Sequence, residues 1–192
     1  MAKTPVSHRI FFSFLAALFF LTAFSLSFLV LWQAHQQSQS QKATQTLPIC
    51  TNAVPPANVI NVAAQKGSKL EGTKLVDFTP CQVAQLQKID VKLGSGPAAT
   101  ASSTVVVDYT GAVAATGVIF QSSLDSGQQA QLSLSSVIPG WQEGITGMKA
   151  GGIRRLLIPA ALAYGANPPN NSGIPANADL VFDVTLHLIV PS

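Results

Sequence analysis

The segment LVFDVTLHLIV at residues 180–190 has an apolar residue at every even position. Side chains of a β-strand point alternately to the two faces of a sheet, so this period of two predicts one long strand with an apolar face. That face carries Leu180, Phe182, Val184, Leu186, Leu188 and Val190. Asp183, Thr185 and His187 alternate with them, and we expect these polar side chains to lie on a solvated face. The segment therefore predicts a sheet that packs one of its two faces against a hydrophobic core.

Segments upstream repeat the strand pattern and add one helix. TVVVDYT at residues 104–110 is rich in β-branched side chains, and residues 153–158 form another apolar run. Trp141, Ile145 and Met148 follow the spacing of one face of a short helix. The pattern as a whole predicts an α+β domain in which one short helix packs on an antiparallel sheet.

Five segments, taken together and in order, resemble the FKBP-type peptidyl-prolyl cis-trans isomerases. They are VDYTG (107–111), IFQSS (119–123), VIPGWQEGITGM (137–148), LLIPAALAYG (156–165) and IPANADLVFDVTL (174–186). The resemblance implies an isomerase domain at residues 86–192. Its fold would be a strongly bent antiparallel sheet of five to six strands wrapped around one short helix. Its activity would be the rotation of X-Pro peptide bonds, which is slow without a catalyst.

The resemblance also implies a substrate pocket with apolar and aromatic walls. The matching positions are Tyr109, Phe120, Gln121, Val137, Ile138, Trp141, Tyr164, Ile174 and Phe182. Trp141 would form the floor, and Phe120 and Phe182 would pack on the proline ring. The Ile138 amide and the Tyr164 hydroxyl would bind substrate carbonyls. Such a site acts by desolvating the amide and holding a turn, so neither a cofactor nor a metal is implied.

Two departures from the family pattern concern the walls of this pocket. Gln121 stands where the family usually has an aspartate, and Ala130 stands where it usually has an aromatic residue. Asp108 also occupies a position at which many members carry histidine. These departures leave open an alternative function, a proline-peptide binding or chaperone module with little turnover. They also leave open whether macrolides such as rapamycin are ligands.

The N-terminal part reads as a membrane anchor. Residues 10–32 form an uncharged run of 23 residues, long enough for a helix to cross a hydrocarbon core of about 30 Å. Lys3 and Arg9 precede the run, so residues 1–9 are expected in the cytoplasm and the isomerase domain outside it. This predicts an N-terminal transmembrane helix that acts as a single-pass signal-anchor in the cell membrane. A cleaved signal peptide, which has a shorter apolar stretch, is the alternative.

Two further segments separate the anchor from the domain. Residues 33–48 are polar and of low complexity, which predicts a flexible linker. Residues 49–85 form an extension that holds the chain's two cysteines, Cys50 and Cys81. In an oxidising compartment they would form a disulfide that clips the extension to the domain, and two free thiols are the alternative.

The charge of the chain gives little sign of a nucleic-acid partner. The formal net charge is +3, but beyond the anchor nine basic residues face eight acidic ones. Nucleic-acid binding needs clustered basic charge, so the expected partners are proline-containing polypeptide clients that the protein helps to fold. Residues 49–80 are too short for the helical dimer arm of some relatives, and a monomer is expected.

Overall fold

The computed structural model describes residues 47–51 and 69–190 of the chain. The predicted cytoplasmic N-terminus (1–9) and membrane anchor (10–32) lie outside these residues, as does nearly all of the predicted linker (33–48). Within the described ranges, no helix combines the length and the hydropathy that crossing a membrane requires.

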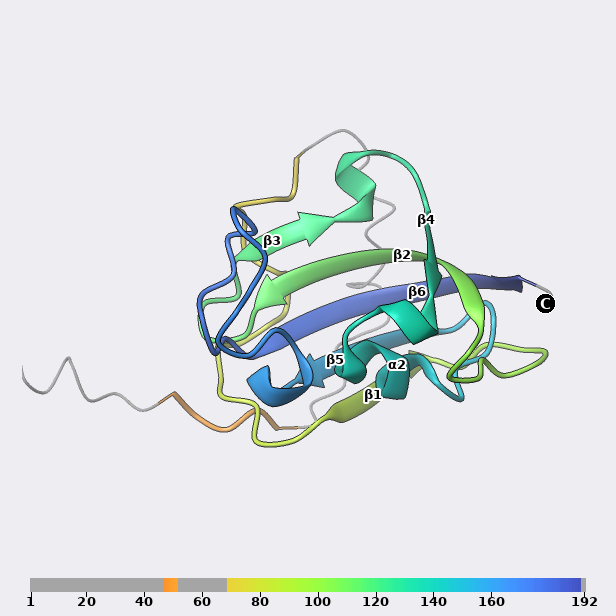
Figure 1. Cartoon of the computed structure of the whole chain (residues 1–192), viewed down its shortest axis with the longest axis horizontal. Coiled ribbons are helices and arrows are strands. Elements are labelled where there is room, and N and C mark those ends of the chain that lie inside the picture. The colour runs from red at the N-terminus through yellow and green to blue at the C-terminus, as the bar shows by residue number, and fades with distance from the viewer. Residues whose placement is uncertain (1–46, 52–68, 191–192) are drawn as a thin grey trace, which may run out of the picture. The chain divides into compact units, whose positions relative to one another are not determined.

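In the part of the chain that is described, six strands form one bent antiparallel sheet (Figure 1). They are β1 (Gln87–Lys92), β2 (Thr104–Val113), β3 (Ile119–Ser122), β4 (Ala130–Ser133), β5 (Ile153–Ile158) and β6 (Leu180–Val190). Their order is β1-β5-β6-β2-β3, and β4 pairs with β2 outside this path. The helix α2 (Pro139–Ile145) lies against one side of the sheet (Figure 1). The predicted bent antiparallel sheet with one short helix is thus confirmed.

Helix α2 begins at Pro139, whose fixed φ and missing N–H suit the first helical position. Trp141 and Ile145 are buried, as their spacing predicted. Gly144 faces β5 so closely that an added Cβ would lie 2.7 Å from Leu156 Cδ1. This close approach brings Trp141 down onto the sheet.

Both sides of the sheet are buried. Leu156 and Phe182 belong with α2 to one cluster of buried side chains, which we call the inner core. Their sequence neighbours Leu157 and Val181 belong to a second cluster, the outer core. Side chains of the extension complete the outer core: Cys50, Leu70, Leu75, Cys81 and Val83. The extension therefore covers the side of the sheet that α2 leaves free.

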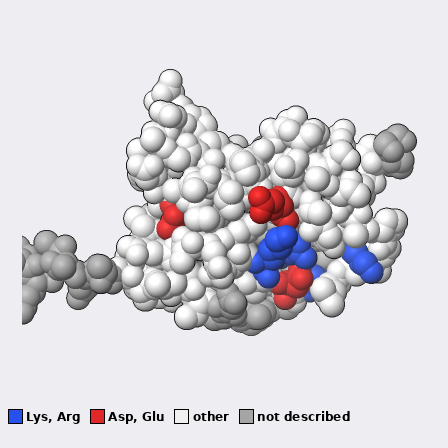
Figure 2. Space-filling model, turned by 60° about the horizontal axis from the view of Figure 1, so that its bottom comes forward, with Lys and Arg blue, Asp and Glu red and all other residues white. Residues whose placement is uncertain are grey.

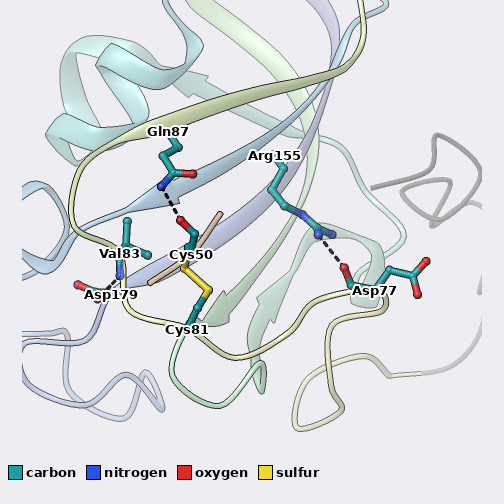
Figure 3. The surroundings of a disulfide bond; sticks show 7 residues. All are labelled: Cys50, Asp77, Cys81, Val83, Gln87, Arg155 and Asp179. Atoms are coloured by element: carbon teal, nitrogen blue, oxygen red, sulfur yellow. Dashed lines mark hydrogen bonds between the residues drawn. A yellow bond between two sulfur atoms is a disulfide. The ribbon is translucent and has the colours of Figure 1, made fainter. Parts of the chain in front are cut away.

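Asp183 corrects the prediction of a solvated polar face on β6. It is only 5% exposed, and its carboxylate pairs with Arg155 through Nε–Oδ1 and Nη2–Oδ2 distances of 2.6 and 2.8 Å. Arg155 also donates to the carbonyl oxygen of Asp77 at 3.0 Å (Figure 3). Because the extension shields this side, the carboxylate is buried, and the two-pronged pairing compensates for its lost hydration.

A β-bulge changes the alternation near the end of β6. The ladder with β2 shifts between Val106 and Val107, and His187 has no partner in it. A bulge adds one residue to a strand and reverses which side chains face the core beyond it. Leu188 is consequently 45% exposed, whereas Ile189 packs against the inner core. The prediction that Leu188 shares the apolar face was wrong.

A disulfide joins Cys50 to Cys81 and holds residues 47–51 against the domain (Figure 3). The Cys50 N–H donates to the Gln82 carbonyl at 2.9 Å, and the Gln82 N–H donates to the Pro48 carbonyl at 2.9 Å. The Gln87 side-chain amide donates to the Cys50 carbonyl at 3.2 Å. This segment and the sheet belong to one compact unit.

Charged side chains are few on the face shown in Figure 2, and the largest group places acidic beside basic residues. Among the described residues, Arg154 pairs with Asp90 at a Nε–Oδ1 distance of 2.7 Å and donates to the Gly144 carbonyl at 2.6 Å. Such a mixture of signs gives this face no extended basic surface of the kind that binds a phosphate backbone.

Candidate active site

Four aromatic rings from four different elements meet on the inner side of the sheet. Trp141 of α2 lies edge-on to Tyr109 of β2 and to Phe182 of β6, with ring centroids 5.6 and 5.4 Å apart. Phe120 of β3 lies edge-on to Phe182 at 5.7 Å. These T-shaped contacts place the positive edge of one ring against the negative face of the next, which stabilises the arrangement. We call these four residues the aromatic cluster.

The four rings of the aromatic cluster differ in solvent exposure. Trp141 and Phe182 are 4% and 3% exposed, while Tyr109 and Phe120 are only partly buried. The other apolar candidates pack into the same inner core: Val137, Ile138, Tyr164 and Ile174. The structure therefore brings together eight of the nine predicted site residues. Five of these eight residues are partly exposed, and the other three, Trp141, Ile174 and Phe182, are buried.

Gln121 is the ninth predicted residue and differs from the rest. It follows Phe120 in β3 and pairs with Gly111 across the ladder, but it is exposed. Its side chain makes no hydrogen bond to any described residue. Ala130, the other departure from the family pattern, packs against the inner core from β4. The structure thus does not bring Gln121 into the inner core with the other eight residues.

Gly111 permits the close approach of two rings of the aromatic cluster. An added Cβ there would lie 2.6 Å from Phe182 Cε1 and 2.7 Å from Phe120 Cζ. Our sequence reasoning did not single out this residue. A glycine in the interior of a strand is itself a signal of close approach, and it lies within the segment VDYTG.

Polar groups at the site are hydrogen-bond donors. Burial, and to a smaller extent the neighbouring Tyr164, raises the pKa of the Tyr109 phenol above its usual value. The Ile138 carbonyl accepts the Trp141 N–H at 2.9 Å at the start of α2. The Ile138 N–H and the Tyr164 hydroxyl have no partner among the described residues. Both groups are free to donate to a ligand.

Asp108 precedes Tyr109 but is engaged elsewhere. Its Oδ2 lies 2.7 Å from His187 Nε2, and its Oδ1 accepts a hydrogen bond from Ser123 Oγ at 3.2 Å. Ser123 in turn accepts the Tyr109 N–H at 3.0 Å. Asp108 and His187 thus brace the backbone of β2 beside the aromatic cluster.

Comparisons with known proteins point to one family. A sequence model described as "FKBP-type peptidyl-prolyl cis-trans isomerase" matches residues 96–187. A probable FK506-binding protein of Corynebacterium glutamicum is 46% identical over 98 residues, which are 50% of this chain and 80% of that protein. The FKBP-type isomerase FkpA of Escherichia coli is 42% identical over 131 residues, 68% of this chain and 43% of FkpA.

Solved structures give the same relationship. The crystal structure of FkpA from Escherichia coli superposes with a TM-score of 0.52 and 34% identity, covering 85% of this chain and 70% of that one. The crystal structure of AtFKBP13 gives a TM-score of 0.50 with 31% identity, over 55% of this chain and 93% of that one. The sequence relatives and the matching fold lead to one conclusion: the chain belongs to the family of FKBP-type peptidyl-prolyl cis-trans isomerases.

Proposed function

We propose that this protein accelerates rotation about X-Pro bonds in exported polypeptides, at the apolar surface over the aromatic cluster. The observation that carries the proposal is the meeting of four rings from α2, β2, β3 and β6 beneath a partly exposed rim. A site that is mostly apolar, with a few convergent polar groups, is the usual form of a site for a small ligand or side chain.

The chemistry of the reaction requires little more than such a surface. Rotation about a peptide bond is opposed by amide resonance, with a barrier of about 18–20 kcal/mol. Removing the amide from water weakens that resonance and so favours the transition state over the ground state, and hydrogen-bond donors hold the substrate in place while the bond rotates. No nucleophile takes part, because no covalent bond is made or broken.

The proposed roles are those that the family resemblance implies for these residues. The buried Trp141 is the floor on which the proline ring rests, and Phe120 and Phe182 flank the ring. The Ile138 N–H and the Tyr164 hydroxyl donate to carbonyl oxygens on the two sides of the rotating bond. Holding both carbonyls keeps the bound chain in a turn, which suits the twisted state.

We further propose that residues 10–32 anchor the protein in the cell membrane with its catalytic domain outside the cytoplasm. The basic residues before this run support that orientation. The disulfide between Cys50 and Cys81 also supports it, because disulfides persist in oxidising compartments. Labelling of the two cysteines in intact cells by a membrane-impermeant thiol reagent, after reduction, tests the orientation.

Gln121 and Ala130 favour a second candidate, a module that binds proline-containing segments with little turnover. Gln121 supplies no negative charge beside the rotating carbonyl, and Ala130 leaves one side of the site without a ring. The two candidates differ in rate alone. A wild-type protein that binds proline peptides without accelerating isomerisation, and that gains activity in Gln121→Asp, supports this second function.

The deciding experiment measures isomerisation of a prolyl peptide by the full chain with a protease-free NMR exchange assay. Phe120→Leu, which removes a rim ring, should lower kcat/KM by about tenfold, roughly the value of one aromatic contact. Phe78→Leu is the matched control, because its ring lies over Arg155 in the outer core. An inactive wild type, or equal effects of the two variants, contradicts the proposal.

A further inference from the structure

Asp179 precedes β6 and uses both carboxylate oxygens to hold two separate parts of the fold. Its Oδ2 accepts the Val83 N–H at 2.8 Å (Figure 3), and its Oδ1 accepts the Ala160 N–H at 2.9 Å. Val83 lies in the extension, two residues after the disulfide-bonded Cys81. Ala160 begins the 3-10 turn η4 (Ala160–Leu162) that follows β5. One side chain thus links the disulfide-closed extension to this turn.

The turn that begins at Ala160 positions Tyr164. The Ala160 carbonyl accepts the Ala163 N–H at 3.1 Å and the Gly165 N–H at 3.0 Å, so Tyr164 lies between two bonded residues. The turn has no capping side chain of its own. Asp179 supplies the acceptor that the first N–H of such a turn otherwise lacks.

Backbone hydrogen bonds also connect Asp179 to the extension. The Cys81 N–H donates to the Ala114 carbonyl at 3.1 Å, and the Ala114 N–H donates to the Asp179 carbonyl at 2.9 Å. Backbone and side chain of Asp179 are therefore both tied to the segment that the disulfide closes. A displacement of that segment is passed directly to Asp179.

We infer that Asp179 is a positioning residue for the isomerase site, through which the disulfide-closed extension holds Tyr164 in place. The inference rests on the proposed function, because that function assigns substrate binding to the Tyr164 hydroxyl. Without the carboxylate, two backbone N–H groups lose their acceptor and the turn is released. A displaced donor weakens substrate binding, whereas the rings that surround the proline stay where they are.

The first arm of the test measures KM and kcat for a prolyl peptide in variants of the full chain. Asp179→Ala should raise KM by about tenfold and change kcat by less than about twofold, because a binding hydrogen bond is misplaced. Asp179→Asn keeps one acceptor and should give a smaller rise. Unchanged KM in both variants, or a loss confined to kcat, overturns the inference.

Asp125→Asn is the matched control for this arm. The Asp125 carboxylate also accepts two backbone N–H groups of the extension, those of Leu70 and Glu71, at 2.7 and 3.0 Å. It makes no hydrogen bond to the η4 turn. The KM of the Asp125→Asn variant should equal that of the wild type. A rise in KM as large as that of Asp179→Asn overturns the inference.

The second arm tests the link to the disulfide. Replacing Cys50 and Cys81 by serine should raise KM in the wild-type background and add little in Asp179→Ala, because the connection is already broken. If the two serine substitutions raise KM by the same factor in the wild-type and Asp179→Ala backgrounds, the effects are independent and the inference is overturned.

Amide hydrogen exchange at Ala163 and Gly165 gives a readout that needs no turnover. Faster exchange in Asp179→Ala and Asp179→Asn than in Asp125→Asn supports the inference, and equal exchange overturns it, even where the serine variants do not fold. An inactive wild type refutes the proposed function alone, and exchange then decides the inference.

Discussion

Gly111→Ala tests the aromatic cluster through a single methyl group. The added Cβ would lie 2.6 Å from Phe182 Cε1 and 2.7 Å from Phe120 Cζ. Carbon atoms in good contact are about 3.5–4.0 Å apart, so both rings must move by roughly 1 Å. Overpacking of this size costs ~1–3 kcal/mol, and we expect the free energy of unfolding to fall by about 2 kcal/mol.

The same displacement should reduce activity. A misplacement of about 1 Å in a binding site can cost ~10²-fold, so kcat/KM for a prolyl peptide should fall at least about tenfold. Urea denaturation followed by circular dichroism measures the stability, and the protease-free NMR exchange assay measures the rate. Both measurements use the full chain.

A double-mutant cycle identifies the rings as the cause. Phe120→Leu removes the Cζ atom that the methyl group would meet, so Gly111→Ala should cost at least ~0.5 kcal/mol less in that background. Phe78→Leu, in the outer core, should leave the cost of Gly111→Ala unchanged. Wild-type stability and rate in Gly111→Ala, or equal coupling to Phe120 and Phe78, would refute the reasoning.

Three further predictions concern other parts of the fold. Asp183→Asn should lower the free energy of unfolding by ~3–5 kcal/mol, because it leaves the buried Arg155 unpaired; a urea midpoint close to that of the wild type would contradict this. Because the pKa of Tyr109 is raised in the folded state, its contribution to stability is present below about pH 10 and is lost as the pH rises through the raised pKa. In a plot of the urea midpoint against pH, Tyr109→Phe should therefore show a smaller fall above about pH 10 than the wild type. An identical plot for the two proteins would contradict this. Ile189→Ala should cost ~1–3 kcal/mol and Leu188→Ala less than ~1 kcal/mol, since the bulge turns Ile189 to the core; the reverse order in urea melts would rule out the bulge.

Much of the inner side of this fold could be predicted from local patterns. The alternation over residues 180–190 and the spacing of Trp141, Ile145 and Met148 predicted a strand and a short helix, and both are present, although the helix ends at Ile145. These patterns are visible because each records the burial of one face at a fixed period. The resemblance to FKBP-type isomerases added the candidate site, and eight of its nine residues belong to the inner core or pack against it.

The outer side could not be predicted in the same way. Asp183 looks like a solvated residue in the strand pattern, and its burial depends on an extension that comes about a hundred residues earlier in the chain. The bulge at His187 is equally invisible, because it arises from the pairing with β2 and leaves the composition of the strand unchanged. Asp179 is a third case, since its two acceptors are used by residues far apart in sequence.

The amino-acid sequence by itself determined the long C-terminal strand, the short helix and the family resemblance, because these depend on residue types at short and regular spacing. Only the tertiary structure decided that the sheet is buried on both sides, that Gly111 sets the distance between two rings, and that Asp179 joins the extension to the turn of Tyr164. These features depend on contacts between distant segments, and such contacts leave no periodic trace in a single sequence.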